Sequence, residues 1–214
     1  MKKEIIDLYD LIIAKLANLV LENWKEIYLY VSFFENKKGE LYFYYFPKKI
    51  IKTKPINCYE IPEKFGIDEN AFNNKLTELY SILEELNNNY VVPKCTNATI
   101  QLTNDIFKIK YSYEDLVNSK YDDAQRRVMW AYKYLGIPIE SMSISERSLI
   151  ETYKENAIIN PMIYTEHINV KIIENSVRTL EILKNKEAKE KNKDNEMKLK
   201  TNNNINNIGN IIVK

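Results

Sequence analysis

The sequence predicts an α+β fold, in which an antiparallel sheet of two hairpins plus a short strand is packed by amphipathic helices and followed by a helical C-terminal extension. In several segments apolar residues recur at every third or fourth position, a spacing that gives a helix one buried face. Elsewhere two pairs of runs carry an apolar residue at every second position, and a polar turn joins each pair. This second pattern is typical of β-hairpins.

Three helices are expected in the first 140 residues. The first lies at about residues 4–21, with apolar residues on one side and charged or amide residues on the other. The second runs from about Asp68, a plausible N-cap, to Asn87, and Asn87–Asn89 are expected to stop it. The third starts near Asp122 and ends at the "LGIP" run.

The first hairpin is expected at residues 25–34 and 40–46. Gly39 can supply the left-handed residue of a three-residue loop, which places Phe34 opposite Tyr42. In this register one face of the hairpin is apolar, and we expect it to belong to the core. That face carries Ile27, Leu29, Val31, Phe33, Leu41, Phe43 and Tyr45.

The remaining strands are shorter. A strand at "INCYEI" should end at Pro62. A second hairpin consists of "NATIQLT", a tight Asn104-Asp105 turn and "IFKIKYSY". Its expected pairs are Leu102 with Phe107 and Ile100 with Ile109, which leaves the opposite face wet.

The C-terminal part has a different character. Residues 145–184 predict one or two looser helices, and from Asn185 onward Lys, Glu and Asn dominate. Such a tail has too little apolar surface to offset the entropy of ordering, so disorder is expected. The sequence therefore divides into a domain at 1–140, a helical extension at 141–184 and a disordered tail at 185–214.

Charge and hydropathy narrow the classes of partner. The 31 Lys and Arg residues nearly balance the 30 Asp and Glu residues, giving a net charge of +1. No global field therefore indicates a nucleic acid or an anionic membrane. Acidic residues interrupt the apolar N-terminal segment, so it does not resemble a signal peptide, and no apolar run reaches transmembrane length. We expect a cytoplasmic protein without a membrane partner.

The residue inventory predicts that the protein is not an enzyme and has no catalytic, cofactor-binding or metal-binding residues. None of the four glycines forms a dinucleotide or phosphate-binding motif. His167 is the single histidine, and Cys58 and Cys95 are too far apart for a metal knuckle. Adjacent carboxylates such as Asp122-Asp123 are expected to be solvated, because acid–base catalysis needs a cleft. Binding remains as the function.

The order of the motifs resembles the YezG/EsaG-like antitoxins, also called the YezG immunity family, over about residues 5–140. The resemblance implies a small α+β protein that binds and silences a secreted nuclease toxin, of a kind associated with type VII secretion. Two features differ from the family pattern: Lys94-Cys95-Thr96 replaces a Pro-Trp-Thr turn, and the chain is longer and less acidic. The resemblance depends on Glu22-x-Trp24-x-x-x-Tyr28, Glu40-x-x-Phe43, Ile61-Pro62, Tyr113–Leu116 and Tyr132-Lys133 with Gly136-Ile137-Pro138.

An acidic segment is the first candidate for a partner-binding surface. The span from residue 60 to residue 85 holds seven acidic residues and two basic ones, Lys64 and Lys75. A nuclease presents a basic cleft, so an acidic surface on its inhibitor would complement it. The alternative interpretation is an ordinary solvated helix face. The acidic residues are Glu60, Glu63, Asp68, Glu69, Glu78, Glu84 and Glu85.

Aromatic residues on the second face of the first hairpin are the other candidate. Tyrosine buries much apolar area at a small entropic cost while its hydroxyl stays hydrated, so interfaces favour it. These rings are expected to meet either a partner or the chain's own extension at 145–184, since exposed aromatic patches reduce solubility. The tyrosines are Tyr28, Tyr30, Tyr42 and Tyr44.

Other classes of function remain as alternatives. A non-catalytic adaptor or regulatory protein-binding domain would use the same surfaces. A nucleic-acid-binding module would use Lys108, Lys110, Arg126, Arg127 and the tail, because basic residues with interleaved aromatics can hold single strands. The lysines, however, alternate as the polar face of an ordinary strand, and the tail mixes both signs of charge.

Overall fold

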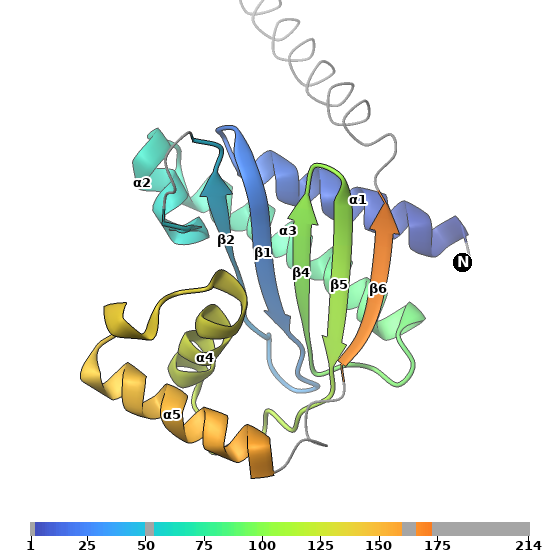
Figure 1. Ribbon diagram of the computed structural model, residues 1–214. Helices are drawn as coiled ribbons and strands as arrows, with labels where there is room; N and C mark the ends of the chain where they lie inside the picture. Colours follow the sequence, from blue (N-terminus) through green and yellow to red (C-terminus); the bar gives the residue numbers. More distant parts are fainter. Residues whose placement is uncertain (1–2, 50–53, 160–165, 173–214) are drawn as a thin grey trace, which may run out of the picture. The chain divides into compact units, whose positions relative to one another are not determined.

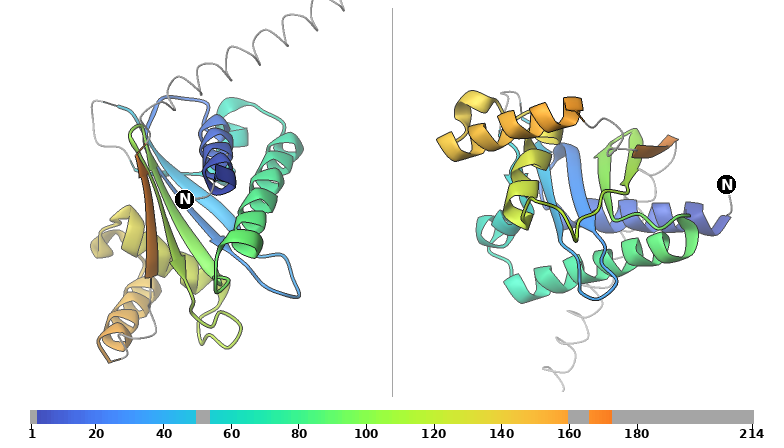
Figure 2. Two further views of the ribbon diagram at one scale, coloured as in Figure 1. Left: turned by 90° about the vertical axis from the view of Figure 1, so that its right-hand side faces the viewer. Right: turned by 90° about the horizontal axis from the view of Figure 1, so that it is seen from below.

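The computed structural model describes residues 3–49, 54–159 and 166–172, and it has the predicted α+β class. One antiparallel sheet has the strand order β3-β2-β1-β4-β5-β6. Helices α1 and α3 cover one face, and α4 with α5 lies on the other (Figures 1 and 2). The helices are α1 (Lys3–Leu19), α2 (Ile61–Phe65), α3 (Glu69–Tyr90), α4 (Asp123–Leu135) and α5 (Ile144–Ile159). The strands are β1 (Trp24–Ser32), β2 (Leu41–Pro47), β3 (Ile56–Asn57), β4 (Asn97–Thr103), β5 (Ile106–Ser112) and β6 (Glu166–Ile172).

The main core lies between the sheet and the α1–α3 layer. The expected apolar face of the first hairpin is buried, apart from half-buried Phe33, and β4 and β5 contribute Ile100, Leu102, Phe107 and Ile109. From the helices, Ile12 and Leu16 of α1 and Leu79 of α3 are fully buried. The apolar stripes of both helices therefore meet one continuous apolar sheet surface.

Local capping explains where α3 and α4 begin. Asp68 accepts a hydrogen bond from the Ala71 amide (2.7 Å) at the start of α3. At the start of α4, the Asp122 carboxylate accepts from the Gln125 amide (2.8 Å), and Gln125 accepts from the Asp122 amide (3.1 Å). Such side chains satisfy backbone amides that have no partner within the helix. Both starts agree with the sequence prediction.

The end of α3 does not agree with it. Asn87 was expected to stop the helix, but α3 continues to Tyr90. Asn87 is buried, and its amide holds the backbone of Cys95: Oδ1 accepts from the Cys95 amide (2.9 Å), and Nδ2 donates to the Cys95 carbonyl (3.0 Å). The residue thus joins the helix to the segment before β4 instead of ending it.

The register of the first hairpin differs from the prediction by four residues. Tyr42 pairs with Tyr30 instead of Phe34, so residues 33–40 form a longer connection. A shift by an even number leaves every side chain on its expected face, because side chains alternate with a period of two. Gly39 is not left-handed: its φ is not positive. Glycine is needed there because a Cβ would lie 1.7 Å from the Ser32 carbonyl oxygen.

The second hairpin has the predicted register, with Leu102 opposite Phe107 and Ile100 opposite Ile109. Beyond it, α5 confirms a helix in the extension. The segment Glu166–Ile172, however, was expected to be helical and is strand β6, paired antiparallel with β5. The predicted disordered tail at 185–214 lies outside the described residues.

The outer edge of β2 is closed by side chains as well as by a strand. The short strand β3 pairs only with Tyr44 and Tyr45. Next along the chain, a 3₁₀ turn (Cys58–Glu60) continues along this edge in place of the longer strand that was expected. Within this turn, Cys58 Sγ accepts a hydrogen bond from the Phe43 amide (3.4 Å), and the Tyr59 hydroxyl donates to the Leu41 carbonyl (3.1 Å). These contacts satisfy backbone groups that β3 does not reach.

Candidate partner-binding surfaces

The aromatic face of the first hairpin is covered by α4. Trp130 lies at the centre of the contact, with its ring centroid 5.3 Å from that of Tyr42, 6.0 Å from Tyr30 and 6.2 Å from Tyr44. Its indole Nε1 donates to the hydroxyl of Thr99 in β4 (2.9 Å). Edge-to-face and tilted rings at these separations add to the stabilisation that burial provides.

A second α4 residue reinforces this contact. Arg127 places its guanidinium 4.7 Å from the centroid of the Tyr42 ring and donates to the Glu40 carboxylate (3.0 Å). A cation over an aromatic face is attracted by the ring quadrupole. Helix α4 is therefore attached to the sheet by a tryptophan and an arginine one turn apart.

The four candidate tyrosines differ in exposure. Tyr30 is 5% exposed and Tyr42 is 1% exposed, whereas Tyr28 and Tyr44 are half-buried. Burial raises the pKa of Tyr30 and of Tyr42 above the ordinary range for tyrosine. These two rings belong to the folded interior and are not accessible to a partner.

The extension has a different position from the one expected. The rings were expected to meet either a partner or residues 145–184, but α4 covers them, and α5 packs against α4. Met129 of α4, Met142 and Ile150 form a small apolar cluster between the two helices. The extension thus packs against α4, the helix that covers the tyrosine rings.

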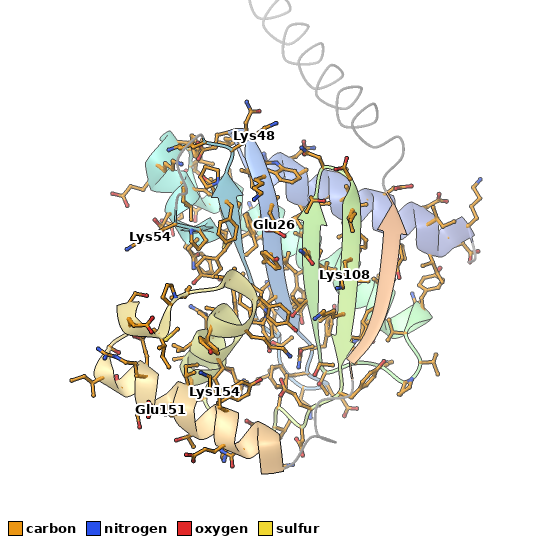
Figure 3. The ribbon with its side chains drawn as sticks, in the orientation of Figure 1. Glu26, Lys48, Lys54, Lys108, Glu151 and Lys154 are labelled. Carbon is orange, nitrogen blue, oxygen red and sulfur yellow. The ribbon has the colours of Figure 1, made fainter. Side chains whose placement is uncertain are left out.

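Tyr28 remains at the border of the covered area. Its hydroxyl donates to Glu26 (2.8 Å), and Gln101 Nε2 donates to the same carboxylate oxygen (2.6 Å). Burial, followed by the bond to Glu26, raises the pKa of Tyr28. On the face of the sheet that Figure 3 presents, Glu26 and Lys108 lie where neither α4 nor α5 covers the strands. The polar side chains there hold one another in place.

All seven acidic candidates are exposed, and several of them accept hydrogen bonds from other residues of the protein. Glu60 accepts from the Asn57 amide, Asp68 caps α3, and Glu78 accepts from Lys15 of α1 (2.7 Å). The bond from Lys15 lowers the pKa of Glu78. Of the two bases in the span, Lys64 is paired with Glu22. Local ion pairs and caps therefore account for part of the acidic pattern.

The two candidate sets do not form one surface. Asp68, Glu69, Glu78, Glu84 and Glu85 belong to α3 or its cap, on the side of the sheet opposite to α4 (Figure 2). The tyrosines face α4. The sheet thus separates these five acidic candidates from the aromatic ones, and a partner that contacts α3 does not reach the Tyr30–Tyr42 pair. Glu60 and Glu63 lie in the 3₁₀ turn and in α2, next to the edge strand β3.

A cavity that the sequence did not indicate lies beneath α4. It is lined by Tyr30 and Thr99 on the sheet, by Trp130 and Met129 of α4, and by charged side chains from both layers. The sequence does indicate that α4 has two buried faces: Arg127, Trp130 and Tyr134 follow a spacing of three and four, on a different face of α4 from Met129 and Tyr132. A helix with two such faces is buried on both.

Residues 3–49, 54–159 and 166–172 contain neither a metal-binding cluster nor a membrane-spanning helix. No group of three or more His, Cys, Asp or Glu side chains in this part of the chain could hold a metal ion. In the same residues, no helix combines the length and the apolarity that a membrane span requires. Cys58 and Cys95 are both buried free thiols, and burial raises the pKa of each to about 12.

The model of the family described as "Immunity protein YezG-like" matches residues 5–150, which is more than half of the chain. The chain therefore belongs to this family, as the resemblance over residues 5–140 indicated.

Curated relatives agree with this assignment. Immunity protein YezG of Bacillus spizizenii is 32% identical over 69% of this chain and 91% of the relative. Immunity protein YezG of Bacillus subtilis is 33% identical over 61% of this chain and 87% of the relative. The type VII secretion system protein EsaG of Staphylococcus aureus is 24% identical over 71% and 94%. The names of the family and of the two Bacillus relatives support an antitoxin or immunity role.

Proposed function

We propose that this protein is a cytoplasmic, non-catalytic antitoxin that binds and neutralises a cognate secreted nuclease toxin. Membership of the YezG-like immunity family carries the proposal. The description of the Staphylococcus aureus relative as a type VII secretion system protein supports a toxin exported by that route.

The acidic residues of α2 and α3 are our proposed capture surface. Glu84 and Glu85 are exposed next to one another near the C-terminal end of α3. Charge complementarity with a basic nuclease cleft acts mainly on the association rate, because long-range attraction guides the encounter. Tyr28 and Tyr44, which are half-buried, are the tyrosines that a partner could still touch.

The proposed function is tested with the C-terminal domain of any secreted protein whose gene adjoins this one and that ends in a nuclease domain. Purified protein should form a complex with that domain in size-exclusion chromatography and abolish its cleavage of DNA or RNA at equimolar ratio. An unchanged cleavage rate together with the absence of a complex would refute the proposal. Metal-dependent nucleic-acid cleavage by this protein alone would refute its non-catalytic part.

The capture surface is tested by the double reversal Glu84→Lys and Glu85→Lys. The variant should associate with the toxin domain more slowly, most clearly at low ionic strength, because salt screens exposed charges beyond about 10 Å. Glu151→Lys with Glu155→Lys is the matched control, since it makes the same change in net charge on α5 across the sheet. Equal association rates for both double variants would show that the α3 acids are a solvated helix face.

A further inference from the structure

Strand β6 is the last strand at one edge of the sheet. On its inner side it pairs with β5 at seven consecutive positions, from Glu166 opposite Ser112 to Ile172 opposite Ile106. On its outer side, no strand of the described residues pairs with it. An edge strand presents a row of backbone N–H and C=O groups that a further strand can bond. The backbone of β6 can therefore accept a seventh strand.

The common ways of protecting a strand edge are not used at β6. Natural proteins protect such edges with prolines, bulges or very short strands. β6 has seven residues, as many as β4 and β5, contains no proline, and pairs with β5 without a shift in register. Its charged residues, Glu166 and Lys171, stand near the two ends, and the central segment 168–170 has none. This edge is thus suited to pairing, unlike the outer edge of β2, which side chains close.

Helix α1 extends beyond the sheet on the same side. Its N-terminal end projects past β6 in Figure 1 and in both views of Figure 2. In the stripe of α1 that faces the sheet, Tyr9, Ile12 and Leu16 are at most 3% exposed, and the Tyr9 ring lies 5.2 Å from that of Phe107 in β5. Ile5, one turn before Tyr9 on this stripe, is only half-buried. The apolar stripe is therefore longer than the sheet is wide, and a seventh strand would cover its exposed end.

The sequence of β6 is complementary to a second copy of itself. In an antiparallel pair centred on Asn169, Ile168 stands opposite Val170 at two positions, which gives apolar cross-strand pairs. In the same register Glu166 stands opposite Ile172, and neutral His167 stands opposite Lys171. No like charges face each other at neutral pH. Such pairs stabilise a sheet, whereas like charges directly opposite would oppose it.

We propose that two copies of this protein associate through β6, antiparallel, about a two-fold axis perpendicular to the sheet. The two six-stranded sheets then form one continuous sheet. The axis keeps both α1–α3 layers on the same face, so β6 of each copy lies beside the other β6 and over the N-terminal end of the other α1. A two-fold contact uses the same surface of both copies and is complete at two. The contact uses neither the α3 acids nor Tyr28 and Tyr44, so it does not depend on the proposed function.

The first measurement is the mass of the full-length protein in solution. A pair of edge strands forms a small interface, so we expect a dissociation constant between about 1 μM and about 1 mM. Sedimentation velocity across this range of concentration should show the mass rising from 25.4 kDa toward twice that value. A mass that stays at 25.4 kDa up to the highest concentration would overturn the proposal.

Amide hydrogen exchange locates the contact. Adjacent residues of a strand direct their N–H groups to opposite edges. Alternate amides from Glu166 to Ile172 should therefore exchange more slowly at high concentration than at low concentration, while the amides between them, bonded to β5, do not change. A dimer without this two-residue period uses another surface and overturns the proposal. Equal protection of all these amides in the monomer would show that another segment of the same chain occupies the edge, which would also overturn it.

A substitution on α1 tests the arrangement of the two copies. Ile5→Glu should raise the dissociation constant about tenfold, because a charge replaces an apolar side chain that the second β6 covers. Leu11→Glu is the matched control: Leu11 is 42% exposed on the same helix, lies off the stripe and undergoes the same change in charge. Urea denaturation in dilute solution shows that both variants fold as monomers. Equal weakening of the dimer by both substitutions would contradict the position of α1 beneath the paired strands.

Discussion

Trp130 of α4 and Thr99 of β4 are joined across two layers of the fold by a hydrogen bond of 2.9 Å from the indole nitrogen to the hydroxyl oxygen. Both residues are buried, at 6% and 5% exposure. The bond gives the largest ring of the aromatic cluster a polar partner where water does not reach it. It also joins α4 to the sheet beside the cavity that both residues line.

Substitution of Trp130 and substitution of Thr99 should each lower the free energy of unfolding, by different amounts. Trp130→Ala should lower the free energy of unfolding by about 3–5 kcal/mol, because it leaves a cavity among aromatic rings. Thr99→Val should lower it by about 1 kcal/mol, mainly because the indole N–H loses its partner. Urea denaturation at neutral pH measures both changes. If Thr99→Val has the same cost in a Trp130→Phe background, the hydrogen bond is not the cause.

Gly39 should be the least replaceable glycine among the described residues. A Cβ at this position would overlap the carbonyl oxygen of Ser32, which is backbone and cannot rotate away. Gly39→Ala should therefore cost about 3 kcal/mol, the upper part of the usual range for overpacking. Gly66→Ala is the control: its Cβ meets nothing within 4 Å, and only its left-handed φ of +62° opposes alanine, at about 1 kcal/mol. Urea denaturation of both variants should place Gly39→Ala clearly lower in stability.

The two cysteines should be unreactive in the folded protein. Cys58 and Cys95 are buried, and burial raises the pKa of each thiol to about 12, so almost no thiolate forms near pH 8. Ellman's reagent should find no accessible thiol under native conditions and both thiols in concentrated urea. Rapid stoichiometric reaction of the native protein would contradict the buried positions.

Stability should decrease in alkaline solution. Tyr45 has its pKa raised to about 12 by burial and by its bond to Glu22, and burial also raises the pKa values of Tyr30 and Tyr42. Above about pH 10 the unfolded chain loses tyrosine protons that the folded chain retains. The unfolded state then binds fewer protons, so the free energy of unfolding falls as the pH rises. Below that pH the contribution is fully present.

This prediction is measured by urea denaturation at about pH 8 and about pH 10.5. Phenylalanine does not titrate, so Tyr42→Phe should lose less stability between the two pH values than the wild-type protein does. A free energy of unfolding that is the same at both pH values would contradict the assignment of buried neutral tyrosines.

Residue patterns predicted the faces of the sheet better than its loops. The alternation from Ile27 to Val31 correctly identified the core face, because burial acts on every second residue of a strand. The loop length of the first hairpin was wrong because Gly39 was interpreted as a left-handed residue, whereas a close backbone approach requires it. A close approach between distant atoms leaves no local signature in the sequence.

Contacts between residues distant in the sequence also explain why the predictions for Asn87 and for the segment of β6 were wrong. Asn87 favours a helix end by its intrinsic preference, but its contact with Cys95 outweighs that preference. Strand β6 forms at the edge beside β5, and the segment's own pattern did not reveal that neighbour. The candidate acids were found as exposed residues, while the cavity was missed because its lining comes from β1, β4, β5 and two helices.

The closed outer edge of β2 has a consequence for how copies of the protein behave at high concentration. An open strand edge is a template on which another chain can polymerise. Here Cys58 and Tyr59 occupy the positions that an incoming strand would need. The folded protein is thereby protected, at this edge, from self-association into fibres.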